Sequence, residues 1–385
     1  MEPPPPLGKP ELVELLRDRI AHHGPLPFSE FMRHALYAPG LGYYTSAPTL
    51  GTQGDFYTAV TIGPLFARFL AWQTAETWHR LGQPDSFALI EQGAHRAHML
   101  ADLLHELARV EPRLIPCLHL WIIEPDPFRQ SLQAQTLANH PTPLHHVTRP
   151  AELPPNLVGA FLANELPDSF PVDRLRRIDG TWHELRVTWN PASQTFTEIP
   201  CPLRPELLPL LHRESPPDLE GFTLELCPEI ESWFPELLER FATGHILLFD
   251  YALTRQERQH PSRSSGTLRT YHRHRMGTNP LIRIGQQDIT YHIHATRLLE
   301  LAHDRHWTAT FIEQHRAFVG MIAAFLPEDS PRLRAFSPAD HRALQTLVHP
   351  SHLGRALSAL SFRKNWPPTV PPPSLETFAP SPQPP

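Results

Sequence analysis

The sequence predicts an α/β fold built around a parallel sheet. Short apolar runs at 86–91, 118–124 and 158–164 alternate with segments of helical periodicity, which is typical of βαβ units. The chain has 385 residues, enough for two or three structural units of about 150 residues each. A hairpin pattern within 171–220 interrupts the alternation, so we expect an insertion on the C-terminal side of the sheet.

The segments before the first apolar run are predicted to be helical. Leucines recur at helical spacing over 11–22, a second helix begins near Ser29, and aromatic residues mark a third helix over 61–82. We therefore predict an N-terminal helical region over 11–84, with a loop that covers the site, after a disordered leader at 1–10.

The remaining boundaries follow from the same patterns. Proline accounts for 46 of the 385 residues, more than twice its usual share of about 5%, and clusters near the C-terminus. The predicted segments are a core over 85–170 and 221–325, an inserted subdomain over 171–220, C-terminal helices over 326–365 and a disordered tail over 366–385.

Composition excludes several classes of protein. The chain carries 40 acidic and 34 basic side chains, a net charge of −6, which argues against nucleic-acid binding through bulk charge. No apolar run approaches the roughly 18 residues of a membrane span. The 3 cysteines form neither a disulfide framework nor a zinc spacing, and the 25 histidines show no complete ligand set. We expect a cytoplasmic protein without a metal; the oligomeric state is not predicted.

The loop after the first apolar run has the position of a nucleotide-binding loop. Glu91 ends the run, Gly93 allows close backbone approach, and a helix follows. Glu124 ends the next run about 30 residues later, where an acid accepts hydrogen bonds from ribose hydroxyls. A complete GxGxxG is absent, so a plain strand–loop–helix turn fits the spacing equally well, whereas an NAD enzyme is disfavoured.

Two other segments carry acids in loops. Asp55 follows a glycine in the loop 51–58 and either faces a ligand or caps the turn. Glu165 and Asp168 follow the apolar run ending at Asn164, where open α/β sheets place ligands. Such a pair is able to hold a planar cation by bidentate hydrogen bonds, although a loop acid and a cap explain it equally well.

Several segments carry motifs in a fixed order along the chain: Gly24–Phe28, Ala35–Tyr44, Gly54–Thr58, Ala163–Asp168, Phe249–Tyr251, Gly266–His274, Asp288–Thr290 and His349–Gly354. Together they resemble the MidA-like methyltransferases, a family that includes the mitochondrial protein-arginine methyltransferase of complex I assembly. The resemblance implies a class I methyltransferase fold with a Rossmann-like sheet, an N-terminal helical region and an inserted β-hairpin/α subdomain on the substrate side. It also implies S-adenosyl-L-methionine as cofactor and a protein substrate, such as a respiratory-complex or other assembly target.

By matching positions, the resemblance also implies the site residues. The cofactor residues are Asp55, Thr58, Glu91, Gly93, His95, Glu124 and Asn164, and the residues facing the substrate are Glu165 and Asp168. The family loop has the pattern ExGxGxG, whereas this chain has His95 and Ala97 at the second and third glycine positions. Two functions therefore stay open: an arginine methyltransferase, or a degenerate methyltransferase fold that acts as an assembly or scaffold factor.

Overall fold

The computed structural model describes residues 6–46, 63–349, 351 and 353–380. The chain divides into two compact units. Unit 1 comprises Met1–Tyr57, Pro167–Ser232 and Leu253–His294, and unit 2 comprises Thr58–Leu166, Trp233–Ala252 and Ala295–Pro385. The unit that contains the predicted insertion is thus larger than 171–220, because the N-terminal helices and the segment 253–294 belong to it.

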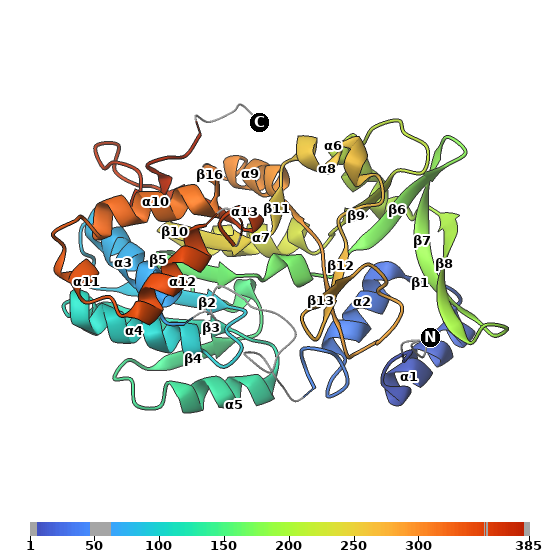
Figure 1. Cartoon of the computed structure of the whole chain (residues 1–385), viewed down its shortest axis with the longest axis horizontal. Helices are drawn as coiled ribbons and strands as arrows, with labels where there is room; N and C mark the ends of the chain where they lie inside the picture. The colour runs from blue at the N-terminus through green and yellow to red at the C-terminus, as the bar shows by residue number, and fades with distance from the viewer. Residues whose placement is uncertain (1–5, 47–62, 350, 352, 381–385) are drawn as a thin grey trace. The chain divides into compact units, whose positions relative to one another are not determined.

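Unit 2 is built around a seven-stranded sheet with the strand order β16-β17-β10-β5-β2-β3-β4 (Figure 1). Neighbouring strands from β10 to β4 are parallel, whereas β17 is antiparallel to both β10 and β16. The strands are β2 (Phe87–Gln92), β3 (Leu118–Ile123), β4 (Leu144–Val147), β5 (Leu157–Asn164), β10 (Phe241–Asp250), β16 (Thr308–Glu313) and β17 (Ser358–Lys364). This topology confirms the predicted α/β fold.

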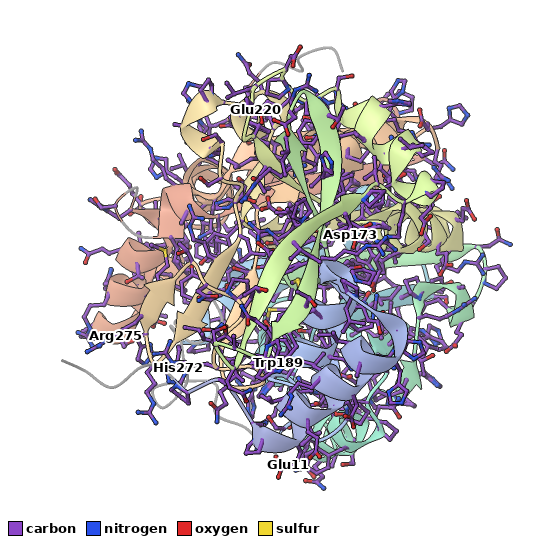
Figure 2. All side chains as sticks on the ribbon, turned by 90° about the vertical axis from the view of Figure 1, so that its right-hand side faces the viewer. Glu11, Asp173, Trp189, Glu220, His272 and Arg275 are labelled. Carbon is purple, nitrogen blue, oxygen red and sulfur yellow. The ribbon has the colours of Figure 1, made fainter. Side chains whose placement is uncertain are left out.

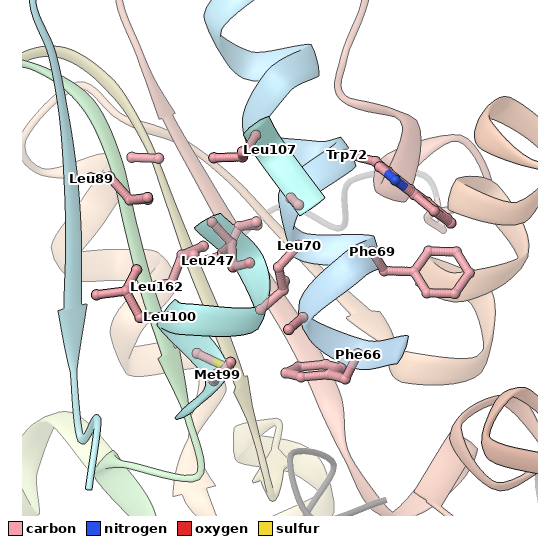
Figure 3. Packing of buried hydrophobic residues seen from close by; sticks show 14 of the residues in the cluster. Phe66, Phe69, Leu70, Trp72, Leu89, Met99, Leu100, Leu107, Leu162 and Leu247 are labelled. Carbon is pink, nitrogen blue, oxygen red and sulfur yellow. The ribbon is translucent and has the colours of Figure 1, made fainter. Parts of the chain in front are cut away.

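The central strands are apolar because helices cover both faces of the sheet. Leu162 of β5 packs in the same cluster as Leu70 and Leu100 of the helices on one face (Figure 3). Its neighbour Phe161 points to the opposite face, where its ring centroid lies 6.4 Å from that of Trp233. Since alternate residues of a strand face opposite sides, a run without polar interruptions fits this environment. Burial of each large apolar side chain contributes roughly 1.5–3 kcal/mol.

The helices of unit 2 agree with the predicted helical segments up to about residue 348. They are α3 (Leu65–Arg80), α4 (His98–Val110), α5 (Pro127–Thr136), α9 (Ala295–His303), α10 (Gln314–Phe325), α11 (Pro331–Arg334), α12 (Pro338–Val348) and α13 (Leu353–Ala356). Helix α7 (Ile230–Arg240) spans the boundary between the units, as does the short strand β11 (Ala252–Leu253). Short 3-10 turns η1 (Ile115–Cys117) and η2 (Pro150–Glu152) precede β3 and β5.

The C-terminal part of unit 2 differs from the prediction of helices over 326–365. Helix α12 ends at Val348, and β17 then pairs along its whole length with β10. Its residues 358–362 are buried on both faces, so the strand lacks the alternation that distinguishes a strand from a helix in sequence.

The segment 366–380 also differs from the predicted disordered tail. Leu375, within the 3-10 turn η6 (Ser374–Glu376), is fully buried in the main core cluster. The Glu376 carboxylate accepts hydrogen bonds from Arg363 at 3.0 and 3.1 Å and from the Ser361 hydroxyl at 2.6 Å. Prolines within the segment therefore do not prevent ordering, because one buried leucine and one paired carboxylate anchor it.

Unit 1 contains a five-stranded antiparallel sheet with the path β1-β7-β6-β9 and β8 paired to β7. Its strands are β1 (Leu26–Pro27), β6 (Asp173–Ile178), β7 (Thr181–Asn190), β8 (Thr195–Pro202) and β9 (Thr223–Leu226). Strands β7 and β8 confirm the predicted hairpin, and Asn190 closes its turn by accepting from the Ala192 amide at 3.0 Å. Figure 2 shows Trp189 near the end of this hairpin and Asp173 at the start of β6.

Unit 1 also contains several helices, short turns and a second, three-stranded sheet. The predicted N-terminal helices are present, and Leu12, Leu16 and Ile20 form the buried side of the first. The helices are α1 (Pro10–His23), α2 (Phe28–Tyr37), α6 (Leu208–Glu214) and α8 (Arg255–Arg258), with the turns η3 (Pro167–Ser169), η4 (Pro205–Leu207) and η5 (Pro261–Arg263). The strands are β12 (Arg269–His272), β13 (Arg275–Gly277), β14 (Asp288–Thr290) and β15 (Ile293–His294), of which β12, β13 and β14 form one small sheet.

Candidate functional site

The carboxyl ends of β2 and β5 lie where the strand order of the unit 2 sheet reverses. From β2 the chain builds outward through β3 and β4 on one side, and β5 and β10 then fill the other side. Open α/β sheets bind ligands in the crevice at this position. The loops after the two strands lie close together, since a methyl group on Gly93 would stand 3.3 Å from Cδ1 of Leu166.

In the loop after β2, every second residue from 93 to 97 has a left-handed backbone conformation. Gly93 has φ 78°, His95 has φ 49° and Ala97, the N-cap of α4, has φ 60°. These are the three glycine positions of the family pattern, so the backbone takes a conformation that favours glycine even where glycine is replaced. Each of the two non-glycine residues costs on the order of 1–2 kcal/mol in this conformation.

Two buried oxygen atoms at the ends of β2 and β5 have no hydrogen-bond partner among the described residues. They are Oε2 of Glu91 and Oδ1 of Asn164, whose amide nitrogen donates to Glu165 at 3.1 Å. Glu91 is only 3% exposed, and burial raises its pKa from 4.5 to about 8. An unpartnered buried acceptor is costly, so both atoms suit a ligand that brings N–H or O–H donors.

Glu124 follows the end of β3 and is held by its own segment. Its Oε1 accepts from the Asp126 amide at 3.0 Å, and its Oε2 accepts from the Gln133 side chain at 3.1 Å. Burial raises its pKa, an effect that these hydrogen bonds and the nearby Arg129 oppose. Each carboxylate oxygen has a second lone pair, which leaves capacity for a ligand that presents two hydroxyls.

The His95 imidazole is neutral at physiological pH. Burial and, to a smaller extent, the positive charges of Arg129 and Arg96 lower its pKa from 6.5 to about 4. Its ring therefore adds no positive charge to the loop, and a cationic ligand is not repelled by it.

Glu165 and Asp168 belong to different units. Glu165 follows β5 in unit 2 with φ 49°, and its amide donates to the Phe249 carbonyl at 2.7 Å. Asp168 lies in η3 of unit 1, is buried, and its backbone carbonyl accepts from the Tyr291 amide at 3.0 Å. Each acid is therefore fixed within its own unit, and the predicted pair is not a single cluster within either unit.

Tyr37 and Tyr44, which the sequence analysis did not assign to the site, form a cluster in unit 1 close enough to Asp168 to be affected by its charge. The Tyr44 hydroxyl donates to Oδ1 of Asp288 at 2.8 Å, and Tyr37 donates to Ser169 at 2.8 Å. Burial, together with the negative charges of Asp288 and Asp168, raises the pKa of both tyrosines. The residues come from three motifs far apart in sequence, and only their repeated match to the family pattern could have indicated the cluster.

Asp55 and Thr58 lie outside the described residues. Within the described ranges, no helix is long and apolar enough to cross a membrane. The same part of the chain contains no group of three or more His, Cys, Asp or Glu side chains arranged to hold a metal ion.

The family of the chain follows from its sequence over most of the sheet of unit 2. Residues 69–312 match the family described as "Putative S-adenosyl-L-methionine-dependent methyltransferase", which is well over half of the chain. The chain belongs to this family. The cofactor is therefore S-adenosyl-L-methionine, and the α/β sheet is the Rossmann-like sheet of a methyltransferase.

Relatives and solved structures agree with the family. The chain is 27% identical over 312 residues to the mitochondrial protein arginine methyltransferase NDUFAF7 homolog of Drosophila melanogaster, covering 74% of this chain and 68% of that one. It is 25% identical to human mitochondrial NDUFAF7, covering 79% and 71%. A Burkholderia thailandensis structure bound to S-adenosyl-homocysteine has a TM-score of 0.82 at 25% identity, covering 97% and 98%. A native structure from the same organism gives 0.81 at 26% identity.

The expected cytoplasmic location is wrong by this comparison. The named relatives from fly, mouse and human are mitochondrial proteins. The expectation rested on cysteine usage, which does not distinguish one reducing compartment from another.

Proposed function

We propose that the protein transfers the methyl group of S-adenosyl-L-methionine to an arginine side chain of a protein substrate. The observation that supports this most is the end of β2, where a glycine-type loop backbone adjoins a buried acceptor without a partner. The arginine acceptor is supported by the relatives, which are named protein arginine methyltransferases.

The described residues fit the cofactor. In our proposal Glu91 and Asn164 accept hydrogen bonds from its ammonium group, because both present buried oxygen atoms that lack donors. Glu124 accepts from the two ribose hydroxyls. The backbone of Gly93 and His95 approaches the methionine part, and the family resemblance adds Asp55 and Thr58.

The bound cofactor supplies a methyl group on a positively charged sulfur, so the protein mainly has to position the acceptor. A guanidinium nitrogen would take the methyl group as the C–S bond breaks, the proton lost from that nitrogen would pass to bulk water, and S-adenosyl-homocysteine would be left. Glu165 orients the planar guanidinium by charged hydrogen bonds, and Asp168 is the second candidate for this role.

The alternative is a degenerate methyltransferase fold that serves as a scaffold. It is motivated by His95 and Ala97 in place of glycines. The positive φ at both positions supports the enzyme instead, because the loop keeps a glycine-type backbone where glycine is replaced.

The test is methyl transfer from S-adenosyl-L-methionine labelled in its methyl group. The purified protein is incubated with arginine-containing and lysine-containing peptide libraries, and the products are analysed by mass spectrometry. We expect label in methylarginine, with Glu165→Gln losing transfer while retaining S-adenosyl-homocysteine binding. The control Glu239→Gln alters an exposed acid paired with Arg305 and should change neither. Label on lysine alone contradicts the proposed acceptor, and full transfer by Glu165→Gln contradicts the role of that residue.

A further inference from the structure

Gln133 of α5 is a buried side chain that joins two parts of the cofactor site. It is 0% exposed. Its amide nitrogen donates to the backbone carbonyl of His95 and to Oε2 of Glu124, both at 3.1 Å. Its carbonyl oxygen lies 3.0 Å from Nε2 of His146, which donates to it. Both N–H groups are thus used, and the amide is fixed from three directions.

The two groups that Gln133 joins are of different kinds, a backbone carbonyl in a strained loop and a side-chain carboxylate. The His95 carbonyl belongs to a residue held at φ 49°, a conformation that a non-glycine residue keeps only where its surroundings enforce it. The Asp126 amide donates to Oε1 of the Glu124 carboxylate at 3.0 Å, and the Gln133 side chain donates to Oε2 at 3.1 Å. The Gln133 amide therefore restrains both the strained loop and one oxygen of the Glu124 carboxylate.

We propose that Gln133 is a positioning residue that locks the loop 93–97 and the Glu124 carboxylate into one arrangement before the cofactor binds. The inference rests on the proposed function, because it takes the loop and Glu124 as cofactor contacts. Preorganisation of this kind increases affinity by removing the cost of ordering these groups during binding.

The chain offers a matched control in Gln130. It is a glutamine on the same helix, one turn before Gln133, and its amide donates at 2.8 Å to the backbone carbonyl of Glu124. Among the residues that the structure describes, the Gln130 side chain makes no hydrogen bond to the Glu124 carboxylate or to the loop 93–97. Gln130→Leu therefore removes a similar interaction from the same helix without releasing the two groups that Gln133 joins.

The experiment is a calorimetric titration with S-adenosyl-homocysteine, accompanied by thermal unfolding without cofactor. We expect Gln133→Leu to weaken binding by about tenfold or more, since a charge-assisted hydrogen bond is lost. Gln130→Leu should stay within about threefold of the wild type. In a His95→Gly background, the loss of affinity caused by Gln133→Leu should be at least about threefold smaller than in the wild type, because glycine adopts the loop conformation unaided.

Two results overturn the inference. One is wild-type affinity in a Gln133→Leu variant that unfolds cooperatively; the other is an equal loss with and without His95→Gly, which indicates general structural damage. If Gln133→Leu does not fold, the milder Gln133→Asn decides in the same way, because it keeps the amide but shortens its reach.

The variant Glu124→Ala distinguishes a failure of the proposed function from a failure of the proposed role of Gln133. If Glu124→Ala binds S-adenosyl-homocysteine as the wild type does, the proposed cofactor contact of Glu124 is contradicted. If Glu124→Ala binds weakly while Gln133→Leu binds normally, only the positioning role of Gln133 is contradicted.

Discussion

Replacing Glu91 with glutamine should change how the stability of the ligand-free protein depends on pH. Glu91 is 3% exposed, one of its oxygens lacks a partner among the described residues, and burial raises its pKa to about 8. Glutamine has almost the same shape but cannot ionise, so it isolates the contribution of the buried charge.

The size of this pH dependence follows from the difference in the pKa of Glu91 between the folded and the unfolded chain. The unfolded chain has a Glu91 pKa near 4.5 and the folded chain near 8, so the folded protein binds the extra proton between these values. The contribution to stability is fully present below pH 4.5 and is lost as the pH rises toward about 8. At about 1.4 kcal/mol per pH unit, the loss is on the order of 3 kcal/mol at pH 7 and 5 kcal/mol above pH 8.

The assay is urea unfolding of the wild type and Glu91→Gln, without cofactor, at intervals from pH 4.5 to 8.5. The stability of the variant relative to the wild type should increase steadily with pH, by several kcal/mol over the range. Glu239→Gln, an exposed acid, serves as the control and should give a nearly constant difference. A constant difference for Glu91→Gln, within about 0.5 kcal/mol, would refute the argument that a buried proton is held at this position.

Three further predictions concern other parts of the structure. Gly93→Ala should lower the unfolding free energy by about 1–2 kcal/mol and weaken S-adenosyl-homocysteine binding in calorimetry, because φ 78° strains alanine; unchanged affinity would contradict the role of the loop. Glu376→Ala should cost about 1–3 kcal/mol in urea unfolding, because it leaves the partly buried Arg363 without its carboxylate. Tyr44→Phe should cost about 1.5–3 kcal/mol through the lost hydrogen bond to Asp288, and equal stability would show that the bond contributes nothing.

Parts of the candidate site were predictable because they depend on strand ends. Apolar runs that stop at Glu91, Glu124 and Asn164 are visible in sequence, and parallel strands bring their carboxyl ends to one edge of a sheet. The conformations of His95 and Ala97 were not predictable from residue type, since each normally avoids positive φ. Their left-handed backbone depends on tertiary contacts that sequence patterns do not contain.

Other features escaped prediction for similar reasons. The role of Gln133 depends on a hydrogen bond to a backbone carbonyl 38 residues away in sequence. Strand β17 lacks alternation because it is buried on both faces. The segment 366–380 has the composition of a disordered tail, and its order rests on Leu375 and Glu376 finding partners in the core and on the sheet.

The most direct test of the account is a calorimetric titration of S-adenosyl-homocysteine into the wild type and His95→Gly. We predict saturable binding at one site for both proteins, because the wild-type loop already has the glycine-type backbone. Binding by His95→Gly alone would contradict the account, since it would mean that the histidine closes the site and that the chain acts as a scaffold. Absence of binding by both would show that the cofactor does not bind at the loop after β2.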